Sequence, residues 1–311
     1  MTSELDLGIQ SDANTPSAGR LTVFASPGGT LATKDADGNI QNYSSFAISE
    51  GSPGPGEESL IYDSATDTGY YGLATHEEVC DGIDLASDIG LTAGSNFNDE
   101  TGWLKFYVGP AADCNKDGVS KILFIAKETL RYNLSWDDIY DAGAVYGTGD
   151  NGVADSGSPE PQVAEVDYGG YDYKVRLLTG SAVDPAAEGY GNQDCADDAG
   201  AGSEWNDLLY RVHTATPDCG NPSEGMEGGN KTTYHGGAQD GANWANFSNE
   251  DLQVYYSDAG NGTYCWCQEQ GDDTSRRVLR GYRGVASFYT STSSGSPSNR
   301  GWRPCLELIQ P

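Results

Sequence analysis

A run of acidic and amide side chains from Asp113 to Gly118 has the D-x-N-x-D-G spacing that opens many calcium-binding loops. An EF-hand loop also needs a bidentate glutamate at its twelfth position, where this chain has Phe124. The run lies between two strand-like segments, 103–108 and 121–130, whereas an EF-hand loop lies between helices. We therefore predict a hairpin turn, keep a calcium site of another kind as the alternative, and assign no metal ligand.

Cysteine and histidine, which bind metals and act in catalysis, are few and scattered. No two cysteines have C-x-x-C spacing, and their odd number leaves at least one without a partner in the chain, so the disulfide pairing stays open. The chain also lacks G-x-S-x-G, H-E-x-x-H and glycine-rich phosphate-binding patterns. We predict no catalytic residue, no cofactor and no enzymatic activity. The residues concerned are Cys80, Cys114, Cys195, Cys219, Cys265, Cys267, Cys305, His76, His213 and His235.

Aromatic side chains set among serine, glycine and asparagine offer a different chemistry, that of a binding surface. Such rings give a large, rigid contact area at a low cost in conformational entropy, as in antibody paratopes. Four tryptophans, Trp103, Trp136, Trp205 and Trp302, fall on apolar faces or in the closing segment, and we expect them in the core. The alternative for the remaining aromatic positions is an ordinary solvated loop. The predicted ligand-binding residues are Trp244, Trp266, Tyr282, Arg283, Phe288, Tyr289, Ser298 and Asn299.

The charge of the chain excludes some partners and favours one environment. Seventeen basic and 47 acidic side chains give a formal net charge of −30. Self-repulsion of this size destabilises a folded protein unless salt screens it, so we expect a halophilic or marine source, with an ordinary acidic surface as the alternative. Nucleic acid is not an expected partner, because phosphate binding needs a basic surface. Six of the ten arginines lie in 276–303, and we expect them to pair with carboxylates inside the fold.

The secondary structure that positions these residues is predicted to be that of a loop-rich α+β protein. Forty-two glycines and nineteen tyrosines favour short strands with many turns. Two short strands around the turn at 27–29 predict an N-terminal β-hairpin module in 1–46, followed by a Gly/Pro-rich linker at 47–58 and a large domain at 59–311. In that domain we expect strands at 103–108, 121–130, 171–180, 263–270, 277–280 and 305–308, and helices beginning at Ser135 and Ser203.

Membrane insertion and secretion signals are not expected. No apolar run approaches the roughly 20 residues that a membrane helix needs. The polar, acidic N-terminus does not have the pattern of a signal peptide.

The closing segment, 275–308, carries RVLRGYRG at 277–284 and NRGWRPCLEL at 299–308. It resembles the last part of C-type-lectin-like domains, in the branch shared by formylglycine-generating enzymes and phage tropism proteins. The order of segments over 59–311 resembles phage virion structural proteins, and 20–41 resembles the short attachment modules of tailed-virus fibre and decoration proteins.

This resemblance implies a large C-type-lectin-like domain with a mixed antiparallel sheet and two or more short helices. It implies a virion structural protein of a tailed virus, attached to other virion proteins through the N-terminal module and located at the virion surface. The region 282–299 would contact a host cell-surface receptor, either a glycan or a protein. We expect a homo-oligomer, of which the trimer is the common form in virus fibres.

Two sequence differences from the related proteins bear on the expected ligand and on enzymatic activity. The Glu-Pro-Asn and Gln-Pro-Asp triplets of calcium-dependent sugar-binding lectins are absent, so recognition of sugar through calcium is not expected. Copper oxidases of the formylglycine-generating type place a cysteine where this chain has Ser287, Phe288 and Tyr289. The alternatives to receptor binding are a capsid or tail decoration protein without a ligand and, third, such an oxidase.

Overall fold

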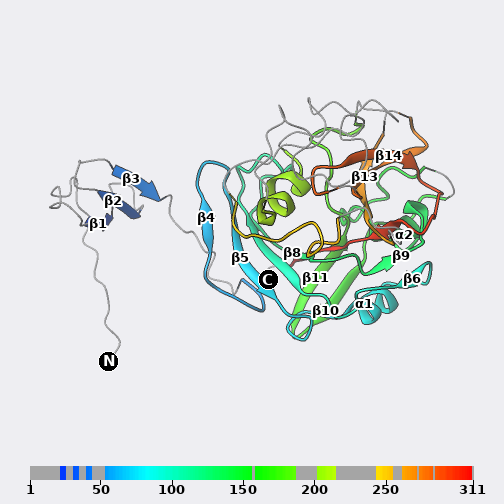
Figure 1. Ribbon diagram of the computed structural model, residues 1–311, viewed down its shortest axis with the longest axis horizontal. Helices are drawn as coiled ribbons and strands as arrows, with labels where there is room; N and C mark the ends of the chain where they lie inside the picture. The colour runs from blue at the N-terminus through cyan, green and yellow to red at the C-terminus, as the bar shows by residue number, and fades with distance from the viewer. Residues whose placement is uncertain are drawn as a thin grey trace. The chain divides into compact units, whose positions relative to one another are not determined.

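The computed structural model describes residues 22–25, 31–34, 40–43, 53–155, 158–186, 202–214, 243–254, 261–271, 273–282 and 284–309 (Figure 1). The chain divides into two units, Met1–Ser52 and Pro53–Pro311, and each is described by itself.

The N-terminal unit contains a three-stranded antiparallel sheet in the order β1-β2-β3. Its first two strands are the hairpin that the sequence predicts, and a third strand extends it. The strands are β1 (Thr22–Ala25), β2 (Leu31–Lys34) and β3 (Ile40–Tyr43).

The second unit begins inside the segment predicted as a linker. The Lys105 ammonium donates hydrogen bonds to the carbonyl oxygens of Gly54, Pro55 and Glu57, at 3.2, 2.8 and 2.8 Å. Burial lowers the pKa of Lys105 to about 8. Residues 53–58 therefore pack as part of the large unit.

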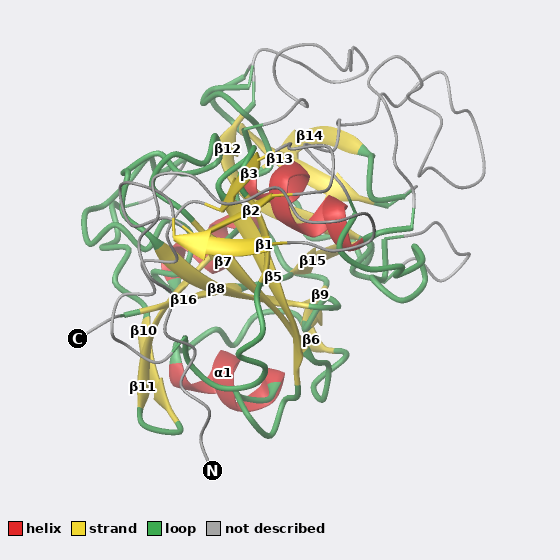
Figure 2. Ribbon diagram, turned by 90° about the vertical axis from the view of Figure 1, so that its left-hand side faces the viewer, coloured by secondary structure: helices red, strands yellow, loops and turns green. Residues whose placement is uncertain are grey.

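Seven antiparallel strands form the larger sheet of this unit, in the order β10-β11-β16-β8-β7-β5-β4 (Figure 2). The C-terminal strand lies between β8 and β11, so the end of the chain closes the middle of this sheet. The strands are β4 (Ile61–Asp63), β5 (Thr68–Ala74), β7 (Trp103–Val108), β8 (Lys121–Ala126), β10 (Glu165–Tyr168), β11 (Tyr171–Arg176) and β16 (Cys305–Leu308).

Six strands form the other sheet, in the order β14-β13-β12-β15-β9-β6. Its pairs are antiparallel except β12 and β15, which run parallel. The strands are β6 (Ser95–Asn96), β9 (Arg131–Tyr132), β12 (Tyr264–Gln270), β13 (Arg276–Gly281), β14 (Phe288–Thr292) and β15 (Arg300–Trp302).

The central strands β7 and β8 are apolar on both faces because each face meets a different core. Trp103 and Phe124 point into a first core, whereas their neighbours Leu104 and Leu123 point into a second. Alternation along a strand produces this division, since successive side chains point to opposite faces.

Short helices cover these cores. The helix α1 (Gly82–Asp88) is capped by the Asp81 carboxylate, and α2 (Trp136–Asp141) begins with the predicted capping box at Ser135. Both contribute to the first core, and η1 (Trp205–Leu209), a π-helix continued by the 3₁₀ turn η2 (Tyr210–Val212), contributes to the second. The tryptophans predicted to be core residues, Trp103, Trp136, Trp205 and Trp302, are all fully buried.

The closing segment differs from the expected pair of strands joined by a loop. It forms four strands, β13 to β16, and the last of them belongs to the other sheet. The stretch between the two expected strands, 277–280 and 305–308, contains β14, which pairs with β13. The second unit is therefore mainly β-sheet with a few short helices, an α+β arrangement in broad terms. Within the described ranges, no helix has the length and apolar character needed to cross a bilayer.

Candidate functional site

Three tyrosine rings stack across the β12, β13 and β14 side of the six-stranded sheet. The Tyr264 ring, on β12, lies parallel to the Tyr282 ring, with centroids 4.3 Å apart and planes at 12°. On β14, the Tyr289 ring lies 5.4 Å from Tyr264 at 25°. Tyr264 is 5% exposed, whereas Tyr282 and Tyr289 are half-buried. We call these three residues the tyrosine stack.

Two consecutive residues with positive φ angles bring the Tyr282 ring to the stack. The chain leaves β13 through Gly281, with φ of +93°, and Tyr282 follows with φ of +70°. Only glycine fits the first position, since a Cβ there would lie 2.4 Å from the Thr263 carbonyl oxygen. The second position is costly for a bulky residue, by about 1–3 kcal/mol, and such strain is concentrated at functional sites. The Tyr282 amide also donates a 2.9 Å hydrogen bond to the Thr263 carbonyl.

The Arg300 guanidinium lies beside the stack. Arg300 on β15 is the register partner of Tyr264 in the parallel pair, and its guanidinium lies 5.1 Å from the Trp266 ring centroid. It donates hydrogen bonds to the carbonyl oxygens of Gly295 and Thr292, at 2.9 and 3.3 Å, and to the Ser291 hydroxyl. A half-buried cation is thus fixed next to partly exposed rings.

Electrostatic coupling supports this proximity. Burial lowers the pKa of Arg300, while the phenol groups of Tyr289 and Tyr264 oppose that shift and the neighbouring Arg276 adds to it. Arg276 donates a 3.2 Å hydrogen bond to the Thr290 carbonyl on β14. Two guanidinium groups therefore lie near the stack.

Two predicted binding residues are core residues, and their expected exposure is wrong. Trp266 is 1% exposed, and its indole nitrogen donates a 3.1 Å hydrogen bond to the Leu134 carbonyl. Phe288 is 0% exposed and packs in the second core beneath Arg280. The reason is alternation on β14, which turns Phe288 inward and its neighbour Tyr289 toward the first core and the solvent.

The other predicted residues divide between two places. Tyr282 and Tyr289 belong to the stack, and the adjoining loop supplies exposed Ser298 and half-buried Asn299, whose carbonyl accepts a 2.8 Å hydrogen bond from the Tyr264 amide. Trp244 packs elsewhere: its ring stacks against Tyr70 of β5, and the Arg211 guanidinium lies 3.6 Å from its centroid. Arg283 lies outside the described residues.

Sequence reasoning missed Tyr264 and Arg300 as parts of this site. A signal for Tyr264 was present, because Tyr264 and Trp266 are two residues apart on a predicted strand and therefore share a face. Arg300 carried no such signal, since its place beside Tyr264 depends on the parallel pairing of β12 with β15.

The arginines of 276–303 are held in a way that the sequence did not predict. In the described part of the chain, fully buried Arg280 and Arg303 bind neutral groups rather than the carboxylates we expected. Arg280 donates to the Gly180 and Ser287 carbonyls and to the Asn206 amide oxygen, at 2.7, 3.1 and 2.8 Å. Arg303 donates to the carbonyl oxygens of Ala126, Lys127 and Leu252.

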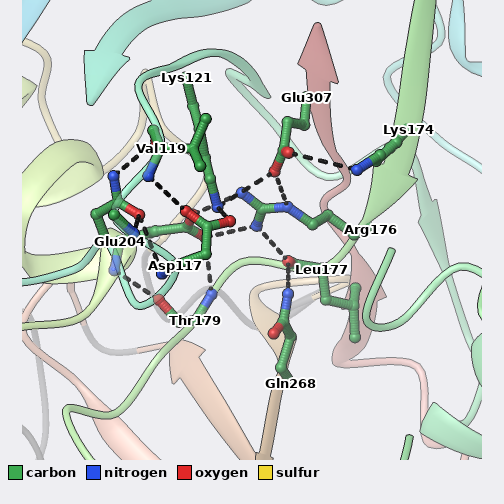
Figure 3. Close-up of polar contacts among 12 residues, drawn as sticks. Asp117, Val119, Lys121, Lys174, Arg176, Leu177, Thr179, Glu204, Gln268 and Glu307 are labelled. Atoms are coloured by element: carbon green, nitrogen blue, oxygen red, sulfur yellow. Dashed lines mark hydrogen bonds and ion pairs between the residues drawn. The ribbon is translucent and has the colours of Figure 1, made fainter. Parts of the chain in front are cut away.

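Carboxylate pairing occurs instead in a network that crosses the neighbouring strands β8, β16 and β11 (Figure 3). Arg176 contacts Glu204 at 2.6 Å and Glu307 at 3.0 Å, and Lys121 contacts Asp117 at 2.8 Å and Glu307 at 3.7 Å. The network ties the larger sheet to the beginning of η1.

This network includes one acidic residue of the D-x-N-x-D-G run. The run forms the turn between paired strands β7 and β8, as predicted. The Asn115 amide oxygen accepts hydrogen bonds from the Asp117 and Gly118 amides, at 3.3 and 3.2 Å. The Asp117 carboxylate accepts one from the Val119 amide at 3.0 Å. No group of three or more His, Cys, Asp or Glu side chains in the described ranges is arranged to hold a metal ion.

Three free cysteines on or beside the closing strands are buried thiols, and one of them, Cys305, lies on β16 itself. Cys265 and Cys267 are both 0% exposed and share the second core. Burial raises the pKa of Cys267 well above its usual range, which keeps it protonated. An oxidase of the kind considered above needs a reactive, accessible thiolate, and neither Cys265 nor Cys267 is accessible.

A shallow depression of about 400 Å³ lies at the other end of the same sheet. Its lining is strongly acidic, and burial raises the pKa of Asp99. It has neither stacked rings nor a cation. The lining residues are Phe97, Asn98, Asp99, Glu100, Thr101 and Glu128.

No protein-family model, curated protein or solved structure matches the chain.

Proposed function

We propose that this chain is a structural protein at the surface of a tailed virus of a halophilic or marine host. Its large unit is a C-type-lectin-like domain that binds a receptor on the host cell, and its small unit attaches it to other virion proteins. The tyrosine stack is the receptor-binding site. We further propose that the protein assembles as a homo-oligomer.

The observation that carries this proposal is the strained Tyr282 stacked on Tyr264. A left-handed tyrosine costs stability, and an asparagine or glycine would adopt this backbone more easily. The strain is understandable if the ring is needed at the surface, where Tyr282 and Tyr289 keep part of their area exposed. Rings of this kind dominate the energetics of binding sites.

The arrangement of the chain supports the remaining parts of the proposal. The N-terminal unit forms a three-stranded sheet of its own, which is suited to attachment. The two closing motifs, at 277–284 and 299–308, fall on β13, β15 and β16, and β14, which carries Tyr289, lies between β13 and β15 in the chain. The net charge of −30 suits a particle that must stay dispersed in high salt.

Binding of the labelled full-length protein to a panel of halophilic and marine cells tests the proposal. We expect binding to at least one cell type, and at least a tenfold loss in the double variant Tyr282→Ala/Tyr289→Ala, since truncating a central aromatic contact costs about 2 kcal/mol. The matched control is Phe97→Ala/Tyr132→Ala, which removes an edge-to-face pair from the opposite end of the same sheet.

Full binding by the stack variant, with folding intact, would exclude the stack as the receptor site. Binding to no cell type, together with normal adsorption of particles that lack the protein, would instead establish a decoration role.

A further inference from the structure

We infer that the receptor group bound at the tyrosine stack is a pyranose ring that carries a negative charge. This inference rests on the proposed receptor-binding function and specifies its ligand. It is argued from the rings, from the cation beside them and from the charge balance of the chain.

The rings favour a sugar. The two outer rings of the stack, Tyr282 and Tyr289, lie on either side of Tyr264 and are half-buried, so each offers part of a face or edge to a ligand. The face of an aromatic ring is electron-rich and attracts the electropositive C–H groups on the apolar face of a pyranose. The exposed Ser298, which precedes the Asn299 carbonyl that accepts from the Tyr264 amide, adds a hydroxyl that can bind a sugar hydroxyl.

The cation favours an anionic group on that sugar. Among the described residues, Arg300 donates to the Gly295 and Thr292 carbonyls and the Ser291 hydroxyl, all of them neutral. No carboxylate in the described ranges lies within ion-pair distance of its guanidinium, and its Nε has no acceptor there. A planar guanidinium with a donor still available matches a carboxylate or sulfate oxygen pair.

The setting makes this arrangement informative. Acidic side chains outnumber basic ones by 47 to 17. The lysines Lys121, Lys127 and Lys174 each have a carboxylate partner within 4 Å. At the stack, Arg300 has a second guanidinium, Arg276, as a charged neighbour, and the Asp273 carboxylate lies near Arg276 in turn. The Arg300 guanidinium, half-buried beside partly exposed rings on an acidic protein, is complementary to an anionic ligand.

The test is a titration of the full-length protein at constant ionic strength, followed by the Arg Nε–H resonances and by calorimetry. The probes are methyl glucuronide, glucose 6-sulfate and neutral methyl glucoside. We expect at least one charged sugar to bind at least tenfold more tightly than the neutral one and to shift the Arg300 Nε–H signal. Comparison of the uronide with the sulfate identifies which anion the site takes.

Variants distinguish the contribution of the Arg300 charge to sugar affinity from the contribution of the tyrosine rings. Arg300→Gln should bring the charged sugar to the affinity of the neutral one, and Arg300→Lys should retain part of the preference. Lys116→Gln, which removes an exposed positive charge from the β7–β8 turn, should change nothing. Because Arg300 also holds the 291–295 turn, near-ultraviolet circular dichroism of each variant must match the unmodified protein. If Arg300→Gln fails that check, Arg276→Gln provides the same test by lowering the preference at least threefold.

Equal affinity for charged and neutral sugars, or a preference that survives Arg300→Gln, would overturn the anionic ligand while leaving the stack as a sugar site. Stack-dependent binding to cells without binding of any sugar would overturn this inference alone and point to a protein receptor. Loss of both kinds of binding would overturn the proposed function as well.

Discussion

Arg176 and Glu204 form a two-pronged ion pair in the interior of the protein. The Arg176 Nη1 lies 2.7 Å from Glu204 Oε2, and Nη2 lies 2.6 Å from Oε1, with the two side chains 5% and 6% exposed. Arg176 ends β11, and Glu204 immediately precedes η1, so the pair attaches the π-helix to the seven-stranded sheet. Glu204 also accepts hydrogen bonds from the Thr179 amide at 3.1 Å.

Removing the charge of Glu204 should destabilise the fold strongly. In Glu204→Gln the Arg176 guanidinium stays buried with one of its carboxylate partners missing, and breaking such a pair costs about 3–5 kcal/mol. Urea unfolding would show the loss as a lower midpoint. The control is Glu128→Gln at the more accessible Lys127–Glu128 pair, whose atoms are 3.7 Å apart and where we expect less than about 1 kcal/mol. Equal losses in the two variants would show that burial does not set the strength of these pairs.

Salt should stabilise the protein while leaving this buried pair almost unaffected. The net charge of −30 produces surface repulsion, and at 1 M salt the screening length falls to about 3 Å. We expect the melting temperature to rise steeply from dilute buffer to molar KCl. The difference in stability between Glu204→Gln and the unmodified protein should stay constant, since buried charges are screened little. A melting temperature that does not change with KCl would contradict the interpretation of the charge as an adaptation to salt.

Local features of the fold could be predicted because their causes are local. The capping box at Ser135 and the doubly apolar run 103–108 each specify an element through neighbouring residues alone. The apolar spacing of Trp205, Leu208, Leu209 and Val212 correctly indicated a buried helical face, although the helix is of the π and 3₁₀ kinds. Helix type depends on a tighter or looser hydrogen-bond ladder, which spacing alone does not reveal.

The candidate site could be predicted only in part because it is assembled by long-range pairing. The aromatic and serine-rich composition of 282–299 predicts Tyr282 and Tyr289 as surface groups. Whether Phe288 points inward, however, depends on the register of β14 with β13. The neutral partners of Arg280 come from distant segments such as Gly180, so nothing near Arg280 in sequence indicated them. Similarly, the insertion of β16 between β8 and β11 brings together strands that lie far apart in the chain.

The carboxyl group of Glu269 should make stability depend on pH. Burial raises the pKa of Glu269 to about 8, with a further upward contribution from Asp184, although the Gly180 amide donates a 2.9 Å hydrogen bond to it. An unfolded glutamate titrates near 4.3, so between about pH 4.3 and 8 the folded state holds a proton that the unfolded state has lost. The Glu269 contribution to stability should therefore fall as pH rises through this window, by at most about 1.4 kcal/mol per unit, whereas buried His213, whose pKa is lowered to about 4, contributes the opposite slope up to about pH 6.5.

Glu269→Gln should remove that slope, because the amide is neutral at every pH and its oxygen can still accept from Gly180. Urea unfolding at pH 5, 6.5 and 8 measures the effect. Glu250→Gln, at an exposed carboxylate, is the matched control and should keep the slope of the unmodified protein. A slope that survives in Glu269→Gln would assign the pH dependence to other groups.

Replacing Tyr282 with asparagine should separate stability from binding. Asparagine adopts the left-handed backbone more readily, and relief of about 1–2 kcal/mol offsets the loss of about 0.5–1.5 kcal/mol of ring stacking on Tyr264. We expect the free energy of unfolding to stay within about 1 kcal/mol of the unmodified value, while cell binding falls at least tenfold. Gly281→Ala is the contrasting variant: its Cβ would lie 2.4 Å from the Thr263 carbonyl oxygen, so it should destabilise the protein clearly. If Tyr282→Asn instead lost more than about 3 kcal/mol in urea unfolding, which is the cost of truncating a large core side chain, the Tyr282 ring would be a structural part of the core rather than a binding group.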